Sequence, residues 1–137
     1  MSLVIDASVS LAWVFGDERH DAAWQVIERL RHEPAWVPAH FHLEVGNGLI
    51  TGLRRRRLTA DQTRTAIVAL GALPIEVDPD TSSRAFSESW PLAARHGLTT
   101  YDAAYLELAL RRRLPLATLD ENLAHAAQSE GVTLAVN

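Results

Sequence analysis

The sequence predicts an α/β domain in which helices cover a central parallel sheet. Short apolar segments of the buried-strand type alternate with longer segments whose apolar residues recur every three to four positions. The chain has 137 residues, 47% of them apolar and 22% charged, as is ordinary for one globular domain. It contains no internal repeat, low-complexity tract or linker, so we expect residues 1–137 to form a single domain.

Five short apolar segments are the expected strands: 3–5 (LVI), 35–38 (AWVP), 73–77 (LPIEV), 115–120 (PLATLD) and 132–136 (VTLAV). Alternation of such segments with helices is typical of βαβ units, in which neighbouring strands run parallel.

Helices are expected in the intervening segments: 6–15, closed by Gly16-Asp17; 22–30; 40–53; 59–71, with Thr59 as cap and Gly71 as stop; 78–97; 101–113; and 121–131. Pro91 is expected to kink or split the helix in 78–97, because proline cannot donate the backbone hydrogen bond of a helix interior.

Composition excludes several classes of protein. The chain has no cysteine, hence no disulfide and no thiolate nucleophile or metal ligand. No apolar run approaches the roughly 18–20 residues that span a bilayer, and the first residues lack the basic region of a signal peptide. We therefore expect a cytoplasmic protein with no membrane partner. The net charge of −4 argues mildly against a nucleic-acid partner, and all 13 basic residues are arginine.

Four carboxylates occupy matched places in the predicted fold. Asp6 and Asp120 follow the first and fourth strands, Glu44 lies early in the helix after the second strand, and Asp102 opens the helix before the fourth. Strand carboxyl ends and the starts of the following helices share one edge of a parallel sheet, where such sheets bind ligands. We expect the four acids to converge there.

Clustered carboxylates raise each other's pKa unless a cation compensates their charge. Mg²⁺ suits carboxylate and water ligands, and it can activate a water for phosphodiester hydrolysis. Each acid also has a purely structural interpretation: Asp102 with Thr99 and Glu121 with Thr118 match capping boxes, and Asp6 fits a strand-to-helix turn. Spacing alone does not separate the two interpretations.

Three blocks, VIDASVSLAWV, VPAHFHLEVGNGL and LTTYDAAYLELALRRRLPLATLDENLAHAAQSEGV, resemble those of PIN-domain proteins, specifically the VapC toxins of prokaryotic toxin–antitoxin pairs. The resemblance runs from about residue 3 to residue 135. It assigns the catalytic, metal-binding acids to Asp6, Glu44, Asp102 and Asp120, with supporting hydroxyls at Ser8 and Thr118. Asp102 would then both cap its helix and face a metal.

The resemblance also implies a three-layer PIN-like sandwich, with a five-stranded parallel sheet flanked by about seven helices. It implies a homodimer and Mg²⁺- or Mn²⁺-dependent cleavage of RNA. A VapB-type antitoxin would inhibit the enzyme by laying its C-terminal segment across the surface. The alternative is a catalytically silent PIN module that binds RNA or antitoxin without cleaving.

The segment HFH before Glu44 departs from the family pattern. A helix places His40 one turn before Glu44 on the same face. The imidazole could stand beside the metal and shift its preference toward Mn²⁺, or it could simply contact backbone or solvent where the helix begins. The role of His42 is open.

Two arginine runs and an aromatic cluster have two interpretations each. The runs 54–57 and 111–113 end helices, where they complement the dipole, yet Arg54, Arg55, Arg111 and Arg112 are also candidate contacts to RNA or to an antitoxin. Trp13, Val14, Phe15 and Trp24 fit the core by default, whereas Trp13 and Phe15 could instead line a groove for a partner helix.

Other enzyme classes lack their motifs. The segment GNGLITG does not follow a strand as a dinucleotide-binding loop does, and Gly46 and Gly48 instead favour a close helix crossing. A haloacid-dehalogenase phosphatase would need D-x-D, where the chain has Asp6-Ala7-Ser8, and a response-regulator receiver would need a lysine. Neither G-x-S-x-G nor H-E-x-x-H occurs.

Overall fold

The computed structural model describes residues 1–15 and 21–135. The predicted helix stop at Gly16-Asp17 and the last residue of segment 132–136 lie outside the described residues.

A four-stranded parallel sheet forms the centre of the molecule. Its strands are β1 (Leu3–Ile5), β2 (Ala35–Val37), β3 (Ile75–Val77) and β4 (Leu116–Ala117), in the order β3-β2-β1-β4. Every neighbouring pair is parallel, with Leu3 opposite Ala35 and Val4 opposite Leu116. The predicted α/β class and parallel strand order are confirmed.

The prediction of a fifth strand over 132–136 is wrong within the described residues. Only one parallel bridge forms there, between Leu116 and Leu134. Leu116 donates to the carbonyl of Thr133 (2.9 Å) and accepts from Ala135 (2.8 Å). Strand β4 is only two residues long, and one of them, Leu116, forms this bridge, so the pairing is too short to make a strand.

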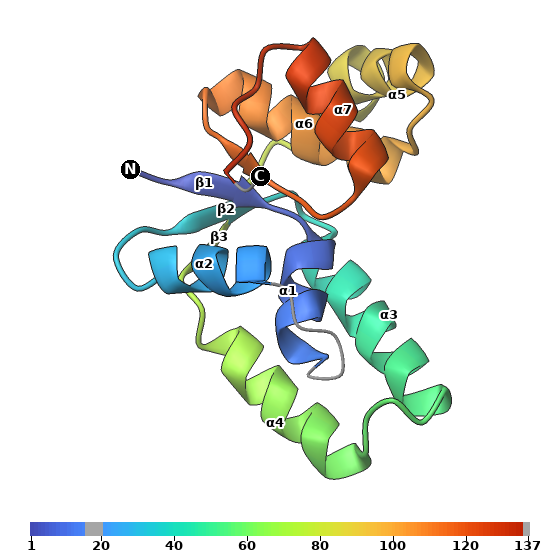
Figure 1. Cartoon of the computed structure of the whole chain (residues 1–137). Coiled ribbons are helices and arrows are strands. Elements are labelled where there is room, and N and C mark those ends of the chain that lie inside the picture. Colours follow the sequence, from blue (N-terminus) through green and yellow to red (C-terminus); the bar gives the residue numbers. More distant parts are fainter. Residues whose placement is uncertain (16–20, 136–137) are drawn as a thin grey trace.

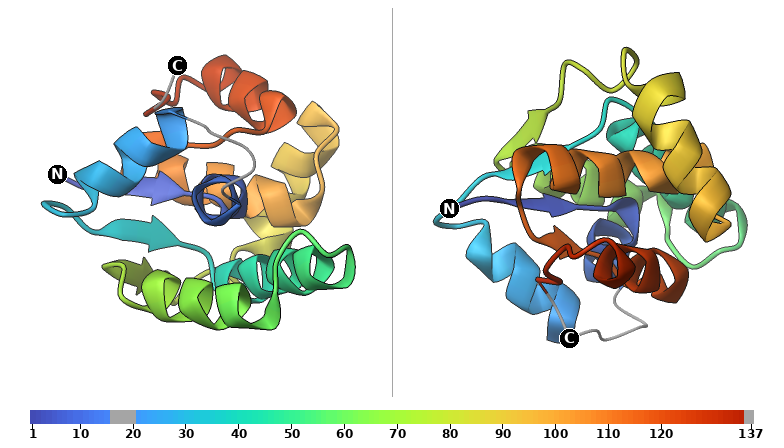
Figure 2. Two further views of the ribbon diagram at one scale, coloured as in Figure 1. Left: turned by 60° about the horizontal axis from the view of Figure 1, so that its bottom comes forward. Right: turned by 90° about the horizontal axis from the view of Figure 1, so that it is seen from above.

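Seven α-helices and one π-helical segment complete the described chain: α1 (Ala7–Val14), α2 (Asp21–Arg29), α3 (Phe41–Arg54), α4 (Ala60–Gly71), the π-helix η1 (Ala85–Ser89), α5 (Trp90–His96), α6 (Thr100–Arg112) and α7 (Glu121–Ser129). Helices α5, α6 and α7 lie above the sheet and α1 to α4 below it (Figure 1). Seen from above, α6 runs alongside β1 (Figure 2, right). The predicted three layers and about seven helices are therefore confirmed.

The core lies where the helix layers meet the sheet. All three residues of β1 are fully buried, as expected for a central parallel strand that is covered on both faces. Helix α6 buries seven consecutive residues, Ala103 to Ala109, so it is central to its layer. None of the described helices combines the length and apolar character that a membrane crossing requires.

Local signals fixed several helix boundaries. Thr59 caps α4 through a capping box with Gln62, as predicted. Pro91 does split its helix: the five-residue π-helix η1 precedes α5, and Pro91 stands in the first turn of α5.

Gly48 confirms the predicted close helix crossing, whereas Gly46 does not. A Cβ at Gly48 would lie against the Leu11 side chain, 2.7 Å from Cδ2, because α1 packs on α3 there. A Cβ at Gly46 would meet nothing within 4 Å.

Candidate active site

Asp6 lies at the carboxyl end of β1, where it is also the N-cap of α1. Its Oδ1 accepts from the Val9 backbone N–H (3.3 Å) and from the Ser8 hydroxyl (2.5 Å), and its Oδ2 accepts from the Thr118 hydroxyl. Only 4% of the residue is exposed. Burial raises the pKa of Asp6 to about 6, although these hydrogen bonds oppose the shift; the charge of Asp102 adds to it.

Two hydroxyls connect Asp6 to the turn that follows β4. Ser8 Oγ accepts from the Leu119 N–H (2.9 Å) while it donates to Asp6, and Thr118 Oγ1 accepts from the Asp120 N–H (3.0 Å) while it donates to Asp6. Each hydroxyl therefore has a backbone donor on one side and the carboxylate on the other. The Asp6 side chain is held from two strand ends.

Asp120 lies in this same turn and is the N-cap of α7, because its Oδ1 accepts from the Leu123 N–H (2.9 Å). The capping box predicted for Thr118 and Glu121 is therefore wrong. Thr118 lies two residues before the cap, and its hydroxyl donates a hydrogen bond to Asp6 instead. Asp120 Oδ2 accepts no hydrogen bond from the described residues.

Glu44 lies in the first turn of α3, and two side chains donate to the same carboxylate oxygen. The Tyr105 hydroxyl donates to Oε1 (2.9 Å), and His40 Nε2 lies 2.9 Å from that atom. The expectation that His40 and Glu44 share a helix face is confirmed. His40 Nε2 also lies 3.1 Å from the backbone carbonyl of Tyr101, as the backbone-contact interpretation predicted. His42 is exposed and packs edge-on against Phe41.

Asp102 lies in the first turn of α6, whose N-cap is Thr99. The Thr99 hydroxyl accepts from the Asp102 N–H (3.1 Å), so Asp102 is the third residue of the helix and not its cap. The predicted pairing of Thr99 with Asp102 at the start of this helix is confirmed by that bond. Partial burial is the main cause of the raised pKa of Asp102. The negative charges of Asp120 and Glu44 raise it further. The charge of Asp102 in turn raises the pKa of Asp6.

The donor set has the chemistry that a hard divalent cation needs, since it consists of carboxylate oxygens near one sheet edge. No three of the described acidic and histidine side chains lie close enough together to hold one ion directly. Mg²⁺ usually binds through one or two carboxylates and keeps several waters, so a more widely spaced cluster still fits it. Burial contributes most to the raised pKa of Asp102, and the negative charges of Asp120 and Glu44 add to it.

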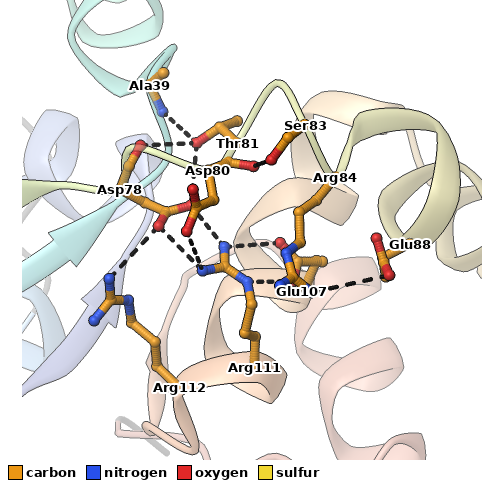
Figure 3. A network of polar contacts seen from close by, with 10 residues as sticks. All are labelled: Ala39, Asp78, Asp80, Thr81, Ser83, Arg84, Glu88, Glu107, Arg111 and Arg112. Atoms are coloured by element: carbon orange, nitrogen blue, oxygen red, sulfur yellow. Dashed lines mark hydrogen bonds and ion pairs between the residues drawn. The ribbon is translucent and has the colours of Figure 1, made fainter.

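Arg111 and Arg112 interact within the chain, away from the acidic cluster, and their contact with RNA or antitoxin stays a prediction. Arg111 forms two hydrogen bonds to the buried Asp78 (3.1 and 2.6 Å) and two to Glu107 (Figure 3). Arg112 covers the ring of Trp36, 3.5 Å from its centroid. Hydrogen bonds from Arg111 hold the pKa of Asp78 below its usual value against the opposing effect of burial.

The remaining predicted contact residues differ in exposure. Phe15 is 8% exposed and packs beneath Arg57, in agreement with the default interpretation as a core residue; its contact with a partner stays a prediction. Trp13 meets Trp24 edge-on, and both line a groove of about 680 Å³ between α1, α2 and α4. Arg54 and Arg55 are exposed where α3 ends, about 15 Å along the helix from Glu44.

Sequence reasoning missed two features of the site. Tyr105 is fully buried and donates to Glu44; its spacing of three residues from Asp102 on one helix was the available signal. In the Asp78–Arg111–Glu107 network, the four-residue spacing of Glu107 and Arg111 on one helix was a signal, whereas Asp78 had none because it lies 33 residues from Arg111.

Comparison with known proteins agrees with this fold. The family model described as the PIN domain matches residues 3–129, so the chain belongs to the PIN domain family. Within that family it belongs among the VapC ribonucleases. It is 31% identical to Ribonuclease VapC3 of Pyrobaculum aerophilum over 124 residues, which cover 90% of this chain and 93% of that protein.

Solved structures share the fold. VapBC2 of Rickettsia felis, crystallised with a DNA fragment from its promoter, matches with a TM-score of 0.68 at 11% identity over 98% of this chain and 97% of that one. VapC20 of Mycobacterium tuberculosis, described as a toxin that cleaves the sarcin–ricin loop, matches with a TM-score of 0.64 at 16% identity over 98% and 99%.

Proposed function

We propose that the protein is the toxin of a VapBC-type toxin–antitoxin pair, a single-domain, cytoplasmic endoribonuclease that hydrolyses RNA phosphodiester bonds. The observation that carries this proposal is the geometry of the acids: Thr118 joins Asp6 to Asp120, and Tyr105 joins Glu44 to the helix of Asp102. The relationship to Ribonuclease VapC3 supports RNA as the substrate class.

Asp6, Glu44, Asp102 and Asp120 would hold a divalent cation, Mg²⁺ or Mn²⁺, one or two of them directly and the others through waters bound to the ion. When bound, such an ion supplies a water activated for attack and stabilises the charge that develops at phosphorus. Asp6 is fixed by Ser8 and Thr118 before any ion arrives, so its oxygens need no rearrangement. The one free oxygen on each of Glu44 and Asp120 is the atom each could offer.

A VapB-type antitoxin is the partner that we propose, by analogy with the VapBC2 structure. The groove between α1, α2 and α4 offers it Trp13 and Trp24, the latter 54% exposed. Arg54 and Arg55 remain candidate contacts for RNA or antitoxin acids. Homodimerisation stays a prediction; the exposed Leu43, Ile50 and Ile67 of α3 and α4 are its candidate surface.

Growth of bacteria that express the protein tests the proposal. The parent is expected to arrest growth, and Asp102→Asn at equal abundance is expected not to, because the variant keeps the size of the side chain and removes its charge. Co-expression of the antitoxin encoded beside the toxin should restore growth. The silent binding module is the second candidate, and it would be favoured if Asp102→Asn arrested growth as strongly as the parent.

A further inference from the structure

His40 has a hydrogen-bonding arrangement that its position at the start of α3 does not require. It is the N-cap residue of α3, yet its side chain makes no capping hydrogen bond to that helix. The imidazole instead lies between two rings of α6, 5.7 Å from that of Tyr101 and 5.4 Å from that of Tyr105. Its Nε2 reaches both Glu44 Oε1 (2.9 Å) and the Tyr101 carbonyl (3.1 Å).

The partners determine which ring nitrogen carries the hydrogen. A backbone carbonyl can only accept, so the bond to Tyr101 requires a hydrogen on Nε2. That hydrogen is shared with Glu44 Oε1, which is also an acceptor. Nε2 therefore has no lone pair to offer a metal in this arrangement, and direct ligation through that atom is excluded.

The same bonds leave Glu44 with one open oxygen. Its Oε1 accepts one hydrogen bond from His40 Nε2 and another from the Tyr105 hydroxyl (2.9 Å). Among the described residues no group donates to Oε2. Hydrogen bonds thus fix the carboxylate through Oε1, while Oε2 stays available. Metal ligands in proteins are commonly oriented in this way by residues that do not themselves touch the metal.

These bonds also cross between layers of the molecule. Helix α3 packs on α1 and α4 below the sheet, whereas α6 packs on α5, α7 and β1 above it (Figure 1). Within the part of the chain that the structure describes, the His40–Tyr101 and Tyr105–Glu44 bonds are the side-chain hydrogen bonds between these two helices. They therefore fix the start of the Glu44 helix to the start of the Asp102 helix.

We propose that His40 is a positioning residue: it occupies Oε1 of Glu44 and joins α3 to α6, so that Glu44 and Asp102 are presented to one cation at a fixed separation. This inference rests on the proposed function, since it concerns the same acidic cluster. His40 touches neither substrate nor metal. Its effect is on the affinity of the cluster for the ion.

Titration of the purified, RNA-free protein with Mn²⁺, followed by the electron paramagnetic resonance of the free ion, tests this inference. His40→Ala is expected to weaken Mn²⁺ binding about tenfold or more, the usual effect of losing a residue that orients a metal ligand. His40→Gln should restore most of the affinity, because the glutamine Nε2 can donate from nearly the same place. His42→Ala is the matched control and should bind as the parent does.

His40→Asn covers the case in which His40→Ala fails to fold, because its amide is too short to reach Glu44 and Tyr101. We expect it to bind Mn²⁺ as weakly as His40→Ala. Parental affinity in a folded His40→Ala or His40→Asn variant would overturn the inference and leave the nuclease intact. A parent protein that binds no Mn²⁺ would overturn the metal-dependent function itself.

Discussion

The carboxylate of Asp6 is buried, and hydrogen-bond donors surround it. Burial is the larger effect, so its pKa rises from 3.8 to about 6 despite three hydrogen bonds. Burying an ionised carboxylate in this way destabilises the native state, and active sites are where proteins keep such groups because the chemistry needs them. Asp6 therefore carries a stability penalty at neutral pH that an uncharged residue would not.

Asp6→Asn is expected to stabilise the metal-free protein at pH 7. Between about pH 4 and pH 6 the unfolded chain releases the Asp6 proton while the native state keeps it, so native stability falls as pH rises through that window. The free-energy advantage of the variant should therefore grow from under about 1 kcal/mol at pH 4 to about 3 kcal/mol at pH 7. Urea unfolding in EDTA at several pH values measures it; a pH-independent difference would contradict the prediction.

Arg111 gives the second prediction at this scale. Arg111→Ala leaves Glu107, which is 5% exposed, without its guanidinium partner, and leaves Asp78, which is 1% exposed, with the longer ion pair to Arg112 (3.6 Å) in its place. Removing one partner of a buried ion pair typically costs about 3–5 kcal/mol. Arg64→Ala, which breaks the exposed pair with Asp61, is the control and should cost under about 1 kcal/mol. Similar urea midpoints for the two variants would show that the network contributes little.

At the scale of the elements, the crossing of α1 and α3 depends on Gly48 and not on Gly46. Gly48→Ala drives a methyl group into Leu11 and should destabilise the protein by about 1–2 kcal/mol. Gly46→Ala meets open space and should be neutral or stabilising by up to about 1 kcal/mol, since alanine is the better helix former. Thermal unfolding distinguishes them, and equal effects would show that the crossing is not tightly packed.

Periodicity and capping signals predicted most elements, because they act within a few residues of one another. The Thr59 capping box and the break at Pro91 are examples. The fifth strand failed because a strand exists only with a partner, and β4 offers one residue for pairing. Strand β4 is also shorter than the predicted segment 115–120: it ends at Ala117, Thr118 bonds to the distant Asp6, and Asp120 caps the next helix.

Across the whole molecule, the sheet topology determines which residues meet. The order β3-β2-β1-β4 places the ends of β1 and β4 side by side, so Asp6 and Asp120 approach across more than 100 residues of sequence. Rules for parallel sheets predict that shared edge. They do not predict that Arg111 turns toward Asp78, that Phe15 is buried or that Tyr105 supports Glu44, because those contacts depend on how the layers pack.

The central claim is that these four acids make the protein a metal-dependent ribonuclease. The most direct measurement is RNA cleavage by the purified, antitoxin-free protein with Mg²⁺, with Mn²⁺ and with EDTA, beside Asp102→Asn under the same conditions. We predict cleavage that requires the metal and that falls below about one hundredth of the parental rate in the variant. Cleavage that persists in EDTA, or in a folded Asp102→Asn protein, would contradict the claim.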